Sequence, residues 1–469
     1  MRRRQQKIEH DGWAFWCLMG LLAWAPLPLA SNRTWALGLL SAAMLALLAA
    51  VCVASARRGE ALLDRLGVGR WPLALLFAYA GWIGLQYAGV LPGIATADRF
   101  NSLQYLLGTL MLSAAFALVL LLARSERRLR WLLGTILVVG LVQALIAILL
   151  FASQAEHIYL FMHYQQGTRA MGTFANFDHL AGFMELCIAA GVGLMLAHMG
   201  SGEQRRSNRR QKLVAALKFM MSGKMLVRLM LVIMVITLVL TRSRMGNAAF
   251  FSSLMIVGGL AMLSNPRLRK GAFWLVLSLI VVDVIIVGQW VGIDHVVERL
   301  QNTSVRTEHA RGEESLEQRA QTPYLALGMV RERPVAGFGA GSFYTVFPRF
   351  KSADKEAYWD YAHNDYVQIA AETGLVGLGL LAGVVLMTIG RIMLLWRAHE
   401  SRFHRGLAFG SAMAICALLI HSWVDFNLQM PANALVFCVL LAVMWALVPR
   451  PPRGSGRSSA ATQVSPDPA

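Results

Sequence analysis

Residues 363–374 join a titratable histidine, His363, to carboxylate and amide side chains, and they run directly into an apolar stretch. Asp365, Gln368 and Glu372 are spaced i, i+3 and i+7, so in a helix they share one polar face, for which a structural role is our first interpretation. Histidine is partly neutral at neutral pH, and in that form it can take a proton from a hydroxyl group. The segment therefore predicts acid–base chemistry at the point where a polar loop enters a membrane.

His421 and Asp425 form a second pair, spaced i and i+4 at a predicted helix end close to Pro431. This position favours a network that caps the helix or fixes the loop. The glycines from Gly337 to Gly341 could bring backbone close to a ligand, but the pattern is too common to identify one. Because no His or Cys spacing is typical of a metal site, we expect neither a metal nor another cofactor.

The composition requires membrane helices to position these residues. Of 469 residues, 57% are apolar and 15% are charged, and the mean hydropathy is +0.52. This predicts an all-α, polytopic transmembrane bundle of about twelve helices over residues 1–448. The apolar stretches lie at roughly 12–30, 34–54, 71–91, 102–123, 131–152, 179–199, 225–241, 245–263, 271–291, 374–396, 406–424 and 432–448.

One long loop, residues 292–373, interrupts the predicted bundle, and its residues 314–331 predict an amphipathic helix. The tail, residues 449–469, is rich in Pro, Gly and Ser and is predicted to be disordered. The first apolar stretch follows an Arg-rich start and resembles a signal peptide, but its length favours a retained first helix.

Basic residues orient the helices. The N-terminus, residues 55–70, 124–130, 200–228, 264–270 and 391–405, and the C-terminal tail carry 30 of the 44 Lys and Arg residues. The positive-inside rule therefore predicts that both termini are cytoplasmic and that the long loop is periplasmic. Topology and attraction to anionic membrane lipids then explain the net charge of +18, so we do not expect nucleic-acid binding.

This orientation places a set of ionisable residues from distant segments at the outer face. Such residues at the edge of a membrane are functional candidates, although each could instead cap a helix or reach the headgroups. The set is Arg169, Asp178, His179, Arg242, Arg244, His363, Asp365, Glu372, His421 and Asp425.

Four motifs together resemble the O-antigen ligase and O-antigen polymerase superfamily. They are residues 172–181 (GTFANFDHLA), 243–246 (SRMG), 363–366 (HNDY) with 372–374 (ETG), and 421–427 (HSWVDFN) with 431–433 (PAN). The third motif is the most specific. The first has Asp178 where Asn is commoner in the family, which leaves the role of that position open.

The resemblance implies a GT-C-like glycosyltransferase of the bacterial inner membrane, with its active site facing the periplasm and no metal. It implies transfer of a glycan from undecaprenyl pyrophosphate to a hydroxyl of lipid A-core or of a growing polysaccharide. His363 matches the general base of the family, and Arg169 and Arg244 match the arginines that bind the pyrophosphate of the donor. Arg242 lies two residues from Arg244 and is a second candidate. The candidate supporting residues, all in the same motifs, are Asp365, Glu372, His421 and Asp425.

The implied chemistry is consistent with these residue types. The guanidinium group is planar and permanently charged, so it can pair with phosphate oxygens and stabilise a leaving pyrophosphate in place of a metal.

Two other classes stay open. A polytopic transporter or lipid-linked sugar flippase would also have about twelve helices, but it is typically built from inverted halves around a site near the bilayer midplane. No similarity between halves is visible here, and the charges collect at one face. A scaffold protein would have no special need for the histidine and the arginines. Within the transferase class, ligation, polymerisation of O-antigen or exopolysaccharide and transfer to protein differ in the acceptor. The variant at 176–179 and the late motif 425–427 favour the polymerase-like or exopolysaccharide branch.

Overall fold

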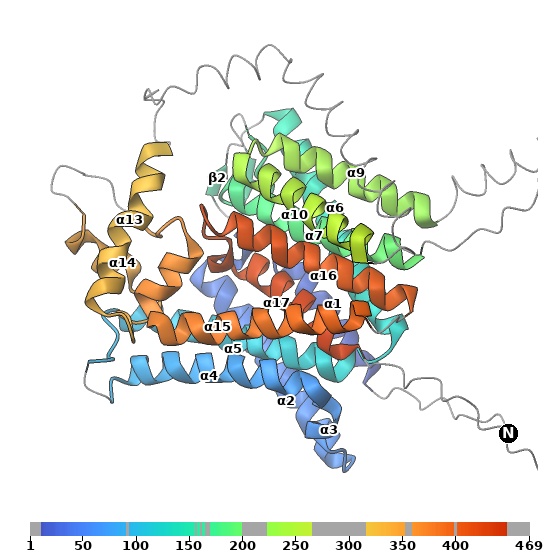
Figure 1. Cartoon of the computed structure of the whole chain (residues 1–469), viewed down its shortest axis with the longest axis horizontal. Helices are drawn as coiled ribbons and strands as arrows, with labels where there is room; N and C mark the ends of the chain where they lie inside the picture. The colour runs from blue at the N-terminus through green and yellow to red at the C-terminus, as the bar shows by residue number, and fades with distance from the viewer. Residues whose placement is uncertain are drawn as a thin grey trace, which may run out of the picture.

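The computed structural model describes residues 11–90, 93–154, 157–159, 162–164, 169–198, 223–264, 316–351, 359–397 and 401–447. Within these residues the chain is helical, apart from a short antiparallel pair of strands, β1 (His157–Tyr159) and β2 (Met162–Tyr164). Figure 1 shows most of the helices side by side in one bundle, with α13 (Leu316–Glu332) and α14 (Phe343–Val346) gathered beyond one of its ends.

In the part of the chain that the structure describes, eight helical segments are long and apolar enough to cross a membrane. They are α2 (Thr34–Arg57), α3 (Leu62–Leu66) continuing into α4 (Arg70–Ala88), α5 (Arg99–Leu122), α6 (Glu126–Ser153), α7 (Phe177–His198), α10 (Arg244–Ser264), α15 (Asp365–Arg397) and α16 (Arg402–His421). Three shorter apolar helices are α1 (Gly12–Trp24), α9 (Gly223–Leu240) and α17 (Pro431–Ala446).

An apolar helix therefore occupies each sequence-predicted span except 271–291, which lies outside the described residues, as do the tail 449–469 and the first part of the long loop. The first helix ends at Trp24, earlier than predicted, because Pro26 and Pro28 follow and neither can donate a backbone hydrogen bond. The all-helical prediction is confirmed for the described chain. The total of twelve helices and the GT-C-like class stay predictions.

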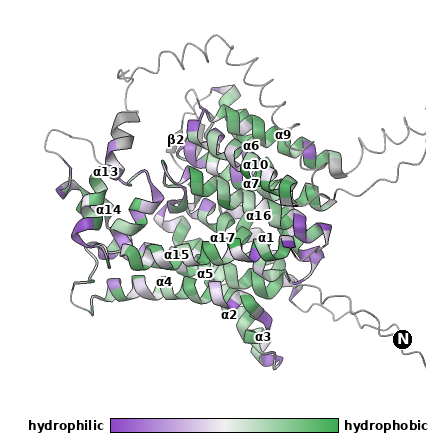
Figure 2. Ribbon diagram, viewed as in Figure 1, coloured by the Kyte–Doolittle hydropathy of each residue, from purple (hydrophilic) through white to green (hydrophobic). Residues whose placement is uncertain are grey.

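Connections between helices gather at two opposite ends of the bundle, and Figure 2 shows hydrophilic residues at both ends of a mainly hydrophobic body. One end, here called the basic end, comprises residues 11, 57–70, 121–130, 397, 401–405 and 447. The other, called the site end, comprises residues 25–33, 89–90, 93–102, 169–178, 240–246, 316–351, 359–374 and 421–433. The four motifs of the sequence lie at or next to the site end.

At the basic end, Asp11 joins three elements. Its carboxylate pairs with Arg65 at 3.0 Å and with Arg128 at 2.7 Å, so the start of α1 is tied to α3 and to α6. Partial burial acts to raise the pKa of Asp11, but the hydrogen bonds and charges of the two arginines outweigh it and hold the pKa below its ordinary value. The first helix is thus an integral part of the bundle.

Helices α7 and α16 pack closely because glycines face each other along their contact. A Cβ atom on Gly410 would overlap the carbonyl oxygen of Ala189, and one on Gly406 would overlap that of Gly193. Small residues at these positions let two backbones approach in a membrane bundle. This pairing sets the positions of two site residues, one on each helix.

Beyond the bundle, α13 (Leu316–Glu332) occupies the position of the predicted amphipathic helix and ends just before Pro334. It packs Ala326 and Met329 against a small aromatic cluster that includes Phe338 and Trp359. The glycine segment, residues 337–341, follows and lies close to the backbone of residues 371–372. Phe338 N donates to Ala371 O at 3.0 Å, and Gly339 N donates to Glu372 O at 2.8 Å. Gly337, Gly339 and Gly341 all have positive φ, which explains the choice of glycine.

Helix α15 contains a break at Gly374, whose φ of +68° and ψ of −177° are not helical. The break divides a short polar helix, residues 365–373, from the apolar helix 375–397. The backbone of α15 is held at this point by the hydrogen bond from Leu375 N to Pro334 O, at 2.8 Å. The polar segment and the predicted span are therefore two helices that meet at an angle set by one glycine.

Candidate functional site

His363 precedes the short helix without capping it. Asn364 supplies the cap, because its Oδ1 accepts a hydrogen bond from Val367 N at 3.0 Å. The backbone of His363 is left-handed, with φ of +51°, which costs a non-glycine residue on the order of 1–3 kcal/mol and is found most often at functional sites. The residue is 6% exposed, so the fold around it determines where the ring lies.

Aromatic rings surround the His363 imidazole. The ring lies edge-on to Trp359, with centroids 5.6 Å apart, and edge-on to Phe426 at 5.0 Å. Phe426 also stacks on Tyr361 at 4.3 Å and contacts the ring of His179 edge-on at 4.7 Å. Burial raises the pKa of Tyr361 to about 12, so this ring stays neutral. His363 and His179 therefore contact the same Phe426 ring, which joins the His363 loop to the start of α7.

Asp365 fastens the His363 segment to the turn after α16. Its carboxylate accepts hydrogen bonds from Ser422 Oγ at 2.8 Å, from Leu428 N at 3.1 Å and from Gln429 Nε2 at 3.1 Å. Asn364 Nδ2 adds a bond to Trp423 O at 2.8 Å. Two motifs that are about sixty residues apart in the sequence thus form one rigid unit.

The rest of the predicted polar face is buried and bonded within the protein. Gln368 Oε1 accepts from Ala362 N at 2.6 Å, and Gln368 Nε2 donates to Glu372 Oε1 at 2.8 Å. Glu372 Oε1 also accepts from Phe343 N at 3.1 Å, at the end of the glycine segment. Glu372 is thus placed to position the loop beyond the bundle.

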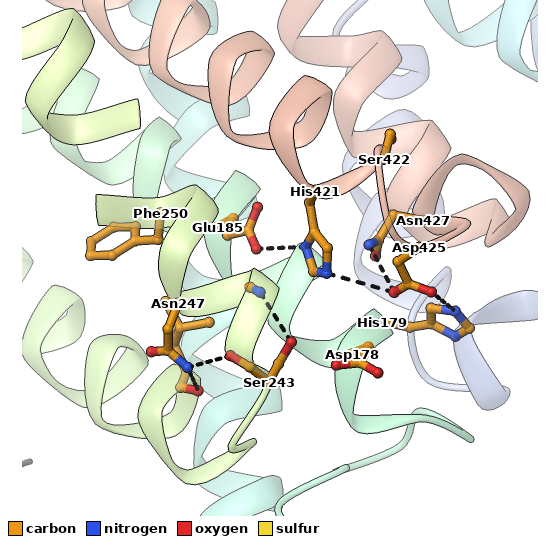
Figure 3. Close-up of polar contacts among 12 residues, drawn as sticks. Asp178, His179, Glu185, Ser243, Asn247, Phe250, His421, Ser422, Asp425 and Asn427 are labelled. Atoms are coloured by element: carbon orange, nitrogen blue, oxygen red, sulfur yellow. Dashed lines mark hydrogen bonds and ion pairs between the residues drawn. The ribbon is translucent and has the colours of Figure 1, made fainter. Parts of the chain in front are cut away.

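His421 and Asp425 belong to a chain of alternating carboxyl and imidazole groups (Figure 3). His421 Nδ1 is 2.8 Å from Glu185 Oε1, and His421 Nε2 is 3.6 Å from Asp425 Oδ2. Asp425 Oδ1 is in turn 3.8 Å from His179 Nε2. The capping interpretation of this pair therefore accounts for only part of its contacts.

Glu185 is the member of this chain that sequence reasoning missed. It is the one acidic residue between positions 179 and 198, inside a predicted span. An ionisable residue at membrane depth is a functional candidate by default. The sequence therefore showed Glu185 as a candidate. It did not show that Glu185 pairs with His421 on α16.

Two asparagines fix the turn that carries Asp425. Asn427 Nδ2 donates to Asp425 Oδ2 at 3.2 Å, and Asn433 Nδ2 donates both to Asn427 Oδ1 and to His179 O, each at 2.9 Å. Gly182 faces this amide pair, and a Cβ atom there would overlap Asn427 Oδ1. The first turns of α7 therefore accept the turn 422–430 only because position 182 has no side chain.

The three candidate arginines lie on two neighbouring loops at the site end. Arg169 places its guanidinium over the ring of Phe177, 4.2 Å from the centroid, and Ala170 N donates to Leu240 O at 3.1 Å. Arg242 and Arg244 follow in the turn between α9 and α10, and both are exposed. Ser243 caps α10 by accepting a hydrogen bond from Gly246 N at 3.1 Å, which leaves Arg244 as the first residue of the helix.

The arginine loops adjoin the histidine cluster through the start of α7. Phe177, which contacts Arg169, is the first residue of α7 and comes two residues before His179. Asp178 lies between them, is buried, and is drawn beside this group in Figure 3. The role of Asp178 stays open. Across the described ranges, no three His, Cys, Asp or Glu side chains are grouped so that they could share a metal ion.

Comparison with known families finds one match, which covers part of the chain. A family model described as O-antigen ligase matches residues 229–382, from α9 into the apolar part of α15. The match includes Arg242, Arg244 and His363, whereas Arg169 and the turn with Asp425 lie outside it. No curated protein matches the sequence. The match over these residues supports the O-antigen ligase superfamily, and the array of apolar helices is that of a multi-pass membrane protein.

Proposed function

We propose that this protein is an inner-membrane glycosyltransferase that moves a glycan from undecaprenyl pyrophosphate to an acceptor sugar hydroxyl at the periplasmic face. The O-antigen ligase domain supports activity on lipid-linked polysaccharide in general and favours transfer over the transporter or flippase alternative. One observation carries the finer proposal. His363, at the entry to the apolar part of α15, shares the Phe426 ring with His179, next to the loops that bear the candidate arginines.

His363 would act as the general base. Its imidazole takes the proton of the acceptor hydroxyl, and the oxygen attacks the anomeric carbon of the donor glycan. The bond from that carbon to the pyrophosphate oxygen breaks, and undecaprenyl pyrophosphate leaves with the bonding electrons. A base held in place contributes typically about 10²–10⁴-fold to such a step. The Asn364 cap and the Asp365 contacts supply that placement.

Arg169, Arg244 and Arg242 would hold the pyrophosphate. Negative charge grows on this group as the bond breaks, and fixed guanidinium groups stabilise it without reorganisation. Arg244 also stands at the N-terminus of α10, where the helix dipole favours an anion. These charges take the place that a divalent metal has in other phosphate chemistry, so we propose a reaction that needs no metal.

The acceptor distinguishes the members of this class. Lipid A-core would make the protein a ligase, and a growing polysaccharide would make it a polymerase of O-antigen or exopolysaccharide. The glycan profile of a deletion strain separates these cases. Short, unpolymerised units on lipid A indicate a lost polymerase, whereas long chains that accumulate on the lipid carrier indicate a lost ligase.

Transfer by the purified protein tests the proposal itself. The protein in detergent or nanodiscs is mixed with the lipid-linked glycan of its own organism and with the acceptor identified from the deletion strain. We expect release of undecaprenyl pyrophosphate and a longer acceptor glycan, at the same rate with and without EDTA. Transfer that stops with EDTA and returns with Mg²⁺ or Mn²⁺ would contradict the assigned role of the arginines.

A further inference from the structure

Glu185 places a carboxyl group in the interior of α7, and neither it nor its partner His421 has any exposed surface. Asp178, Gly182 and Glu185 are spaced i, i+4 and i+7, so they lie on the same face of α7. The close glycine contact between α7 and α16 brings that face to the end of α16, where His421 lies. Each of these placements follows from the helix geometry.

A structural role explains this pair poorly. Removing two charged groups from water costs several kcal/mol each, and well-packed apolar residues often replace a buried ion pair without loss of stability. Glu185 Oε2 has no hydrogen-bond partner among the described residues, so the carboxyl uses only one of its two oxygens. A buried carboxyl that is both costly and only half bonded points to a functional constraint.

The contacts of His421 extend from Glu185 toward the active site. Its two ring nitrogens face two different carboxyl groups, Glu185 at 2.8 Å and Asp425 at 3.6 Å. The other oxygen of Asp425 faces His179, whose ring lies edge-on to the same Phe426 ring that His363 contacts. With a carboxylate on each side, the imidazole can carry a proton on both nitrogens, and the positive charge then attracts Asp425.

We propose that Glu185 is a positioning residue of the transferase site, which acts through His421 and Asp425 on the His179 imidazole beside His363. This inference rests on the proposed function, because it assigns a role in the same reaction. Glu185 is buried inside the protein within the apolar helix α7, and in this proposal it touches neither donor nor acceptor. Its hydrogen bond to His421 orients that ring, and charge transmits the effect from His421 through Asp425 to His179.

Glu185→Gln tests the proposal, because it keeps the size and one acceptor oxygen but removes the charge. We expect kcat to fall about 10-fold or more, the range in which outer partners of a site typically act. The KM for the lipid-linked donor and the thermal midpoint should stay near the wild-type values, since the arginine loops are untouched. Ser411→Ala is a matched control. It removes a buried bond on α16, from Ser411 Oγ to Leu440 O at 3.1 Å, outside this chain of groups, and should keep the wild-type kcat.

A double variant keeps the test decisive if the single variant is unstable. In Glu185→Gln/His421→Gln, two amides can bond to each other, and no charged member of the pair is left buried. The proposal predicts a recovered thermal midpoint with kcat still low. A wild-type kcat in the single variant, or in a stable double variant, would overturn the positioning role.

Ring ¹⁵N signals of the histidines give a readout that does not depend on transfer. Each signal is assigned by its loss in the matching His→Gln variant. In Glu185→Gln we expect the His179 signal to move together with that of His421. A shift confined to His421 would refute the coupling. If the wild-type protein transfers no glycan at all, the proposed function fails, and these signals still decide whether Glu185 acts on His179.

Discussion

At the residue scale, the surroundings of His363 divide structural from chemical duties. Asn364 caps the helix, Asp365 binds the turn 422–429, and Glu372 holds the end of the glycine segment. Each has a partner that explains its presence in the motif. The ring of His363 contacts the aromatic rings of Trp359 and Phe426, and its backbone has the left-handed conformation that is found most often at functional sites. This division supports a chemical role for His363.

The arginines give a prediction at this scale. Arg169→Ala and Arg244→Ala should each lower kcat/KM for the donor about 10-fold or more, because a hydrogen bond to a charged group contributes about 1.5–3 kcal/mol. Lysine at either position should rescue only part of the loss, since an ammonium cannot make two parallel bonds to phosphate oxygens. Steady-state kinetics with the lipid-linked donor measures both effects.

Arg349→Ala is the control for these variants. Arg349 is an exposed arginine at the site end whose pairing with Glu332 at 3.2 Å contributes little, so its loss should leave the donor kinetics unchanged. Normal donor kinetics in both Arg169→Ala and Arg244→Ala would show that the phosphate assignment is wrong, and Arg242→Ala would then be measured next.

At the scale of elements, α7 organises the site. Its first turns carry His179 and accept the turn 422–430, and the next turns carry Glu185 to His421. The glycines at its contact with α16 keep the two helices close enough for these bonds to form. Small residues on this face of α7 are therefore as important to the site as the polar ones.

Gly182→Ala should show this dependence. The added methyl group would overlap Asn427 Oδ1, and relieving such overpacking typically costs about 1–3 kcal/mol. We expect a lower thermal midpoint and reduced turnover, because Asn427 also donates to Asp425. Gly390→Ala on α15 is the control, since a Cβ atom there meets nothing within 4 Å. If both variants melt and turn over like the wild type, the turn does not depend on position 182.

The elements also show where sequence reasoning stops. The apolar stretches predicted the spans because a bilayer requires about twenty apolar residues in a row. The same rule hid Glu185, since one carboxyl group does not interrupt an apolar stretch. The pairing of Glu185 with His421 joins positions 236 residues apart. Contacts of that range depend on which helix faces pack together, and local spacing does not carry this information.

At the scale of the whole molecule, the basic end and the end that carries the motifs lie on opposite sides of the bundle. Asp11 and its two arginines, Arg65 and Arg128, lie at the basic end of the bundle, and the motifs lie at or next to the site end. The sequence predicted this separation from the positions of Lys and Arg alone, through the positive-inside rule. The assignment of the site end to the periplasm rests on that rule.

Cysteine labelling tests the orientation. In a variant without native cysteines, Tyr344→Cys at the site end should react with a membrane-impermeant maleimide in cells whose outer membrane is permeable. Asp64→Cys at the basic end should react only after the inner membrane is opened. Both positions are exposed, so access decides the outcome. Labelling of both residues from the same side would overturn the orientation and every assignment to the periplasmic face.

The general-base role of His363 is the central claim, and the turnover of His363→Gln measured together with its thermal stability tests it most directly. Glutamine can keep a hydrogen bond but cannot accept the proton, so the variant should fold like the wild type and lose about 10²–10⁴-fold in turnover. His363→Ala should be equally slow, with donor binding retained. A stable His363→Gln protein that transfers glycan at the wild-type rate would contradict the account, because His363 would then serve only to shape the loop.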